Sequence, residues 1–207
     1  MMQESKHLAS LINVPPKTIY EIFKSSSDWE FILKIDALLE AAARKVVKVA
    51  FAANDKMDPD DMEEFVDTLP MRCRTSLIKL LEATGCGKEE SLLIDCVRVL
   101  RNGFAHDITQ MTLPLTEVIK SRKDKSNLIK GLSYIQSYKE DELIKMFEND
   151  GSFLRFTILS GTLTFMILAY HAVIKERDTS VHKQYADKLR DEMDRRRLRF
   201  TPIDWQR

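Results

Sequence analysis

The sequence predicts an all-α protein, a helical bundle with one long buried helix at its centre. Apolar residues recur at the three- and four-residue spacing of helices, and strand-like alternation is nearly absent. Glycine and proline are scarce, at six each in 207 residues. The hydrophobic share is 44%, in a chain long enough to bury a core. We therefore expect helices that each bury one face.

We expect three regions along the chain. Residues 1–26 form a short N-terminal helix or arm, in which Pro15 and Pro16 interrupt a brief apolar stretch that does not resemble a signal peptide. Residues 27–178 form the helical bundle. Residues 179–207 form a charge-rich helix and tail.

Charge and cysteine content bound the function. The 32 basic and 32 acidic residues cancel, so binding to nucleic acid must come from a local patch of positive charge. Cys73, Cys86 and Cys96 lack the spacing of metal ligands, and their odd number argues against a disulfide framework. We expect a cytoplasmic protein with no metal site and no cofactor.

The first helix of the bundle starts at a capping box. In "SDWE", Ser27 caps the helix and Glu30 reaches back to the backbone N–H of Ser27. Apolar residues then keep helical spacing for more than five turns. They are Phe31, Ile35, Leu38, Leu39, Ala42, Val46, Val49, Ala50 and Ala53.

Charged residues recur every four positions on another face of this helix, and we expect them to form a solvated stripe. They are Asp36, Glu40, Arg44 and Lys48.

Caps and helix breakers indicate the following elements. Asp58 caps a short helix that has Pro59 in its first turn. The other expected elements are a helix over 71–85 that stops at Gly85, a helix over 88–106, a break at Pro114, a charged loop over 121–127, and two short helices within 128–149.

Residues 152–176 form a long apolar helix, which raises the question of a membrane span. Seven of the 19 residues of "FTILSGTLTFMILAYHAVI" are Ser, Gly, Thr, Tyr or His, and Arg155 precedes the stretch. The centre of a bundle also requires a helix that is apolar all round. We expect a buried core helix and no membrane contact, with His171 as a satisfied or half-exposed core histidine rather than a ligand.

The stretch "RNGFAH" carries the candidate chemistry. A helix turns about 100° per residue, so one face of helix 88–106 enters the core, namely Leu93, Val97, Leu100 and Phe104. The opposite face holds Asp95, Arg98, Asn102 and His106. Arg101 lies on the boundary and can extend its guanidinium round to the polar face.

Arg101, Asn102 and His106 are sufficient for phosphodiester cleavage without a metal. Histidine can deprotonate a ribose 2′-OH or protonate the leaving 5′-oxygen near neutral pH. Arginine can stabilise the charge on a pentacoordinate phosphate, and asparagine can orient either group. Because this chemistry needs a 2′-OH, the substrate would be RNA.

The reaction needs an acid and a base, whereas one chain supplies one such histidine. A two-fold dimer that places two of these helices face to face would supply both. Otherwise a single histidine serves both steps. On residue types alone, an ordinary amphipathic helix explains the same spacing.

The hexamer "RNGFAH" resembles the arginine–polar–histidine motif of the HEPN superfamily. The stretch "SLIKLLEATGCGKEESLLIDCVRVLRNGFAHDI" is similar to the mannitol operon repressor branch in the order of its elements. "FILKIDALLEAAARKVV" and "GSFLRFTILSGTLTFMIL" resemble the opening and closing helices of that branch. The resemblance covers about residues 28–175.

This resemblance implies a HEPN-like bundle that forms homodimers around the motif. Many members are metal-independent endoribonucleases of toxin–antitoxin and other defence systems. It assigns Arg101 and His106 as the catalytic pair, with Asn102 in support, and it implies an RNA substrate and a cognate antitoxin or regulatory partner. The alternative is a mannitol operon repressor-like protein that regulates transcription through binding and has no catalytic activity. We find no clear helix-turn-helix with a basic recognition helix.

Arginines gather in "KLRDEMDRRRLRF" near the C-terminus, interleaved with acids. We expect a solvated terminal helix, with contact to an RNA backbone as the functional alternative. Trp205 is expected to dock on the bundle rather than to stack on a base.

Overall fold

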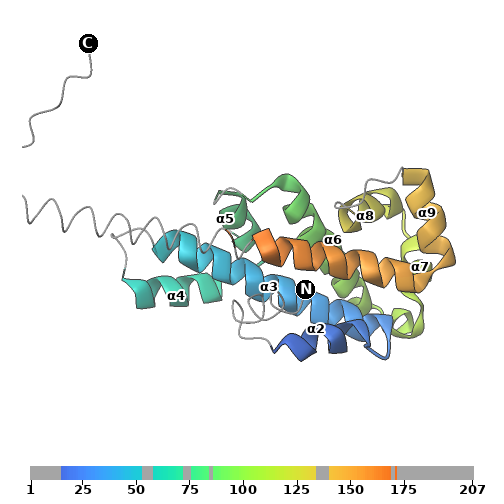
Figure 1. Ribbon diagram of the computed structural model, residues 1–207, viewed down its shortest axis with the longest axis horizontal. Coiled ribbons are helices and arrows are strands. Elements are labelled where there is room, and N and C mark those ends of the chain that lie inside the picture. Colours follow the sequence, from blue (N-terminus) through green and yellow to red (C-terminus); the bar gives the residue numbers. More distant parts are fainter. Residues whose placement is uncertain are drawn as a thin grey trace, which may run out of the picture.

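The computed structural model describes residues 15–52, 58–71, 76–83, 86–133, 140–168 and 171. The described residues form helices, turns and bends without any strand, which confirms the predicted all-α bundle. Figure 1 shows α3 running along the middle of the bundle, with α4 near one end and α8 and α9 at the other.

Helix α3 (Asp28–Ala52) is the central element of the bundle, packed against α2, α4, α5 and α6. The hydroxyl of Ser27 accepts a hydrogen bond from the backbone N–H of Glu30 at 3.1 Å, as the capping box predicts. The Glu30 carboxylate reaches one residue further back than predicted. It accepts from the backbone N–H of Ser26 at 2.9 Å and also from the Ser26 hydroxyl at 2.7 Å. The side chains of Ser27 and Glu30 therefore both fix the start of α3, and Ser26 takes the place of Ser27 as the donor to Glu30.

Helices α2 (Pro16–Phe23), α4 (Pro59–Thr68) and α5 (Leu77–Ala83) cover other faces of α3. Helix α4 begins where the sequence predicts, because Asp58 accepts from the backbone N–H of Asp60 at 2.8 Å. Helix α5 begins later than predicted. Ser76 accepts from the backbone N–H of Lys79 at 3.3 Å and so caps the helix, whereas Met71 lies in a bend. Gly85 lies outside the described residues.

Helix α6 (Lys88–His106) has the predicted ends and buries the predicted face. Leu93, Val97, Leu100 and Phe104 are fully buried. A short 3-10 helix, η1 (Ile108–Thr112), follows, and then α7 (Leu115–Lys120), α8 (Lys125–Leu132) and α9 (Glu140–Asn149). Helix α8 starts inside the predicted charged loop and packs against α6.

The last described helix runs over Gly151–Leu168 and is joined to α3 by a partly buried ion pair. Arg155 donates through Nε to the Asp28 carboxylate and through Nη1 to the carbonyl oxygen of Ser25 at 2.8 Å. The same carboxylate accepts from the backbone N–H of Leu115 at 2.6 Å. Asp28 therefore ties together the starts of α3 and α7 and the last helix.

This last helix buries one face, and the opposite face holds exposed apolar side chains. Leu154, Ile158 and Met166 are fully buried, whereas Phe156 and Leu168 are exposed. Gly151–Leu168 is long and apolar enough to cross a membrane. The core helix of a soluble bundle can have the same length and composition. The sequence predicts a helix that is buried on all sides, whereas this helix is buried on one face only.

Candidate functional site

The three predicted site residues lie on the last two turns of α6, in positions set by helical geometry. Arg101 is half-buried on the flank that faces α3, whereas Asn102 and His106 are exposed on the outer side of the helix. The Arg101 guanidinium reaches round the helix, and its Nη1 donates to Oδ1 of Asn102 at 3.1 Å. The structure therefore brings Arg101 and Asn102 together as the sequence predicts.

Arg101 is held from behind by Asp36 of α3. Its Nε lies 3.7 Å from Oδ2 of Asp36, while 39% of the Arg101 side chain stays exposed. The guanidinium thus has one edge toward the bundle and another edge toward Asn102 and solvent. This arrangement fixes the direction of a permanent cation and leaves part of it available to an anion.

Asp36 itself is buried, with 7% of the residue exposed, so the predicted solvated stripe is wrong at this position. Burial raises the pKa of its carboxyl group above the ordinary value, because it outweighs the opposing effect of Arg98 and Arg101. Nη1 of Arg98 lies 3.5 Å from Oδ1 of Asp36 and 3.3 Å from Oε2 of Glu40. A cluster of alternating charges therefore joins α3 to α6 beside the candidate site.

Arg44 extends this cluster to the end of α4. Its guanidinium donates to Oε1 of Glu40 at 2.6 Å, and to the carbonyl oxygens of Val66 and Leu69. The last carbonyls of a helix lack partners within the helix, and a guanidinium there satisfies them. Burial acts to raise the pKa of Glu40, but the hydrogen bonds and charges of Arg44 and Arg98 lower it below the ordinary value.

His106 is the final residue of α6, and its imidazole is exposed. Within the described part of the chain, no hydrogen bond or ion pair connects it to Arg101 or Asn102. Asp107 ends the helix and accepts from the backbone N–H of Thr109 at 3.0 Å, which fixes the turn after the histidine. This turn presents two large apolar side chains to solvent, with Ile108 77% exposed and Leu113 44% exposed.

Gly103, inside the motif, lies under the side chains of Gln110 and Arg122. A Cβ atom at this position would be 3.4 Å from Oε1 of Gln110 and 3.6 Å from Nη1 of Arg122. The helix continues through Gly103 to His106, so the glycine does not end it. The atoms nearest to Gly103 belong to the side chains of Gln110 and Arg122 and not to another stretch of backbone. Arg122 is held in place by two hydrogen bonds to Asp124, at 2.8 and 3.0 Å.

A surface groove of about 430 Å³ runs along the outer side of α6 from Asn102 toward the start of the helix. This size is within the range of small-molecule sites. Sequence reasoning did not find the groove, because its walls come from three separate segments. The lining residues are Glu40 and Arg44 of α3, Pro70 and Met71, and Asp95, Arg98, Val99 and Asn102 of α6.

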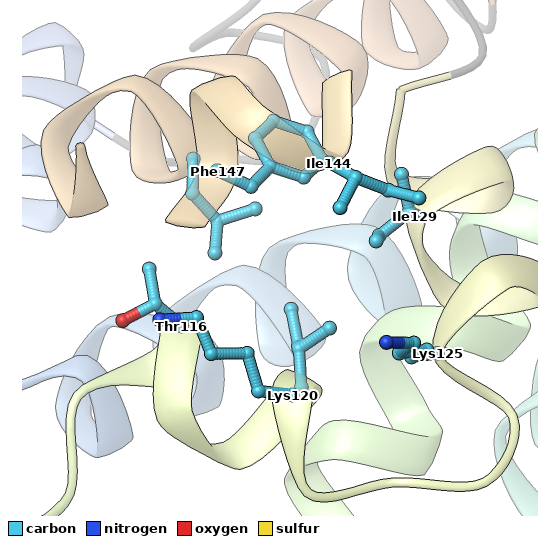
Figure 2. Close-up of a pocket in the computed structure, with 8 residues that line it drawn as sticks. Thr116, Lys120, Lys125, Ile129, Ile144 and Phe147 are labelled. Atoms are coloured by element: carbon cyan, nitrogen blue, oxygen red, sulfur yellow. The ribbon is translucent and has the colours of Figure 1, made fainter. Parts of the chain in front are cut away.

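A second cavity lies between α7, α8 and α9 at the far end of the bundle, and Figure 2 shows Ile144 and Phe147 facing Thr116 and Lys120 across it. Its volume is about 10 Å³, which is room for at most one water molecule. It is therefore not a candidate ligand site.

Comparison of the chain with protein-family models, with curated proteins and with solved structures found no match. The basic stretch with Arg190, Arg195, Arg196, Arg197 and Arg199, together with Trp205, lies outside the described residues.

Proposed function

We propose that the chain is a HEPN-type, metal-independent endoribonuclease. Arg101 binds the phosphate of the cleaved linkage, Asn102 orients it, and His106 transfers protons. The 2′-oxygen attacks phosphorus, the bond to the 5′-oxygen breaks, and the proton lost from the 2′-OH is balanced by one gained by the leaving oxygen. The products are a 2′,3′-cyclic phosphate and a 5′-OH end. The resemblance of "RNGFAH" to the HEPN motif suggests this chemistry.

The observation that carries the proposal is the placement of the Arg101 guanidinium. It is bonded to Asn102 on the solvent side and lies near Asp36 on the buried side, so it is pre-oriented at an accessible surface. A charge that needs no reorganisation during the reaction is the most effective stabiliser of a developing anion. His106 lies about one turn further along the same helix and is exposed.

A second copy of the chain would complete this site. One His106 is available per chain, and the reaction needs a base for the 2′-OH and an acid for the leaving oxygen. The exposed Ile108 and Leu113 flank His106, and exposed apolar groups of this kind mark contact surfaces. We place the two-fold axis of the proposed homodimer beside the end of α6, so that two imidazoles share one groove.

The decisive experiment is incubation of the purified full-length protein with transfer RNA or total RNA in excess EDTA. The proposal predicts fragments with 2′,3′-cyclic phosphate ends, and a loss of rate of roughly 100- to 10,000-fold in His106→Ala, the usual contribution of a general acid or base. His171→Ala is the matched control, because His171 is exposed but lies outside the site. Equal cleavage by the His106→Ala and wild-type proteins would reject the proposal.

The alternative is a mannitol operon repressor-like protein that acts by binding. The contact between Arg101 and Asp36 favours it, because a motif arginine held by a buried carboxylate also has a purely structural use. A folded dimer that leaves RNA intact, and whose cellular activity survives His106→Ala, would support this alternative.

A further inference from the structure

Arg122 reaches the motif from the turn between α7 and α8. Its Nη1 is 3.6 Å from the position of a Cβ atom on Gly103. The backbone N–H of Arg122 donates to the carbonyl oxygen of Ile119 at 3.1 Å, and its Nε and Nη2 donate to Asp124 at 2.8 and 3.0 Å. These bonds fix both the turn and the direction of the guanidinium. A second permanent cation therefore lies beside the candidate site.

One edge of this guanidinium is available to a ligand. Asp124 binds Nε and Nη2, whereas Nη1 has no hydrogen-bond partner among the described residues. Nη1 does not belong to the buried polar atoms that lack a partner, and 27% of the Arg122 side chain is exposed. Solvent therefore reaches Nη1, and guanidinium N–H groups match the oxygens of a phosphate.

The charge of this turn also favours an anion. Residues 120–125 contain four basic residues and one acid. Because the whole chain has no net charge, an RNA strand must be attracted by a local patch of this kind.

Arg122 and Arg101 lie on either side of the exposed residues of the motif. Going round α6 from Gly103, a turn of about 60° leads to His106 and one of about 100° to Asn102. Arg101 follows at about 200°. Burial agrees with this order, since Asn102 and His106 are exposed, whereas the residues that flank them are half-buried. The exposed imidazole and amide thus have a guanidinium on each flank.

We propose that Arg122 binds a second phosphate of the RNA strand, one that flanks the linkage held by Arg101. The inference rests on the proposed ribonuclease function and adds a backbone-binding subsite to it. The two flanks of a helix with its side chains are roughly 10–12 Å apart. One phosphate is too small to bridge that width, whereas two phosphates of the same strand can do so. The strand then crosses α6 over His106.

The first test measures binding apart from activity, with a single-stranded DNA oligonucleotide that lacks the 2′-OH and is not cleaved. Fluorescence anisotropy gives its affinity for the full-length protein at several salt concentrations. We expect Arg122→Gln to weaken binding about tenfold and to reduce the slope of log affinity against log salt by about 0.7, the value for one phosphate of a single strand. Lys79→Gln removes the same charge from α5 and is the control. An unchanged slope in Arg122→Gln, or an equal change in Lys79→Gln, would overturn the inference.

Asp124→Asn separates phosphate binding from a structural role in the turn. This substitution removes the carboxylate that competes with phosphate for the Arg122 guanidinium, so we expect binding at least as tight as in the wild-type protein. If Arg122→Gln and Asp124→Asn weaken binding equally, Arg122 only holds the turn in shape and the inference is wrong.

Replacement of single phosphates by neutral methylphosphonates tests the subsite in the wild-type protein itself. In a DNA oligonucleotide with one ribonucleotide, we expect neutralisation of one linkage that flanks the cut to slow cleavage about tenfold, and Arg122→Gln to be insensitive to the same replacement. Cleavage that no flanking replacement slows, or that one slows equally in both proteins, refutes the subsite only. Oligonucleotide binding that depends on Arg122, without any cleavage, refutes the ribonuclease proposal only.

Discussion

Substitution of Gly131 by alanine tests how closely α8 must approach α6, the helix that carries the candidate site. A Cβ atom added to Gly131 would lie 2.4 Å from Sγ of Cys96 and 3.2 Å from the carbonyl oxygen of Leu92, both on α6. Favourable contacts between such atoms need roughly 3.5–4 Å. The two helices would have to separate by roughly 1 Å, or Cys96 would have to change its rotamer.

The expected cost follows from two opposing effects. Overpacking of a core by one methyl group typically costs about 1–3 kcal/mol. Alanine gains about 1 kcal/mol over glycine in a helix interior. We therefore expect Gly131→Ala to lower the free energy of unfolding by up to about 2 kcal/mol, the difference between these two effects.

Gly103→Ala is the matched control, because Gly103 is also a helical glycine but has more space. Its Cβ would make ordinary contacts, at 3.4 Å or more, and we expect stabilisation of up to about 1 kcal/mol. Urea unfolding followed by circular dichroism measures both variants. Cys96→Ala in the Gly131→Ala background should restore part of the loss. Equal stability of the Gly131→Ala and Gly103→Ala proteins would refute the close approach of α8 to α6.

Three further predictions concern the carboxylates of α3. Asp28→Asn should lower the free energy of unfolding by about 2–4 kcal/mol in urea unfolding, because Arg155 then remains largely buried without its counter-charge. Hydrogen bonds from Lys34 and Ser26 lower the pKa of Glu30 to about 2. The ionised Glu30 therefore contributes to stability above pH 4.5, and this contribution is lost as the pH falls toward 2. An NMR titration of Glu30 with its midpoint at the ordinary pKa would contradict this. Asp36→Asn should change the free energy of unfolding at neutral pH by less than about 1 kcal/mol, because burial already disfavours the ionised carboxyl group and raises its pKa. A loss of several kcal/mol in urea unfolding would show that the ion pairs of Asp36 outweigh the cost of burying its charge.

The sequence predicted α6 closely because its signals are local. Acidic residues at the start of the helix and a core face of Leu93, Val97, Leu100 and Phe104 lie within one segment. The sequence also predicted that the Arg101 guanidinium extends round to the polar face of α6, and there it donates to Oδ1 of Asn102. By contrast, the start of α5 was placed too early, because Met71 continues an apolar pattern although Ser76 caps the helix.

The environment of Asp36 could not be predicted from periodicity. A repeat of four residues places Asp36, Glu40 and Arg44 on one face of α3 but does not say which helix covers that face. Helix α6 covers Asp36, and the end of α4 covers Arg44. One signal was available in retrospect. Arg98 and Arg101, three residues apart on α6, complement the spacing of the two acids, and pairs of this kind indicate packing between helices.

The most direct test of the account uses a DNA oligonucleotide that contains a single ribonucleotide, incubated with the full-length protein in EDTA. We expect a cut immediately after that ribonucleotide, an end with a 2′,3′-cyclic phosphate, and no detectable cut by the His106→Ala protein. An intact oligonucleotide, or a cut that His106→Ala makes equally well, would contradict the assignment of Arg101, Asn102 and His106 to phosphodiester cleavage.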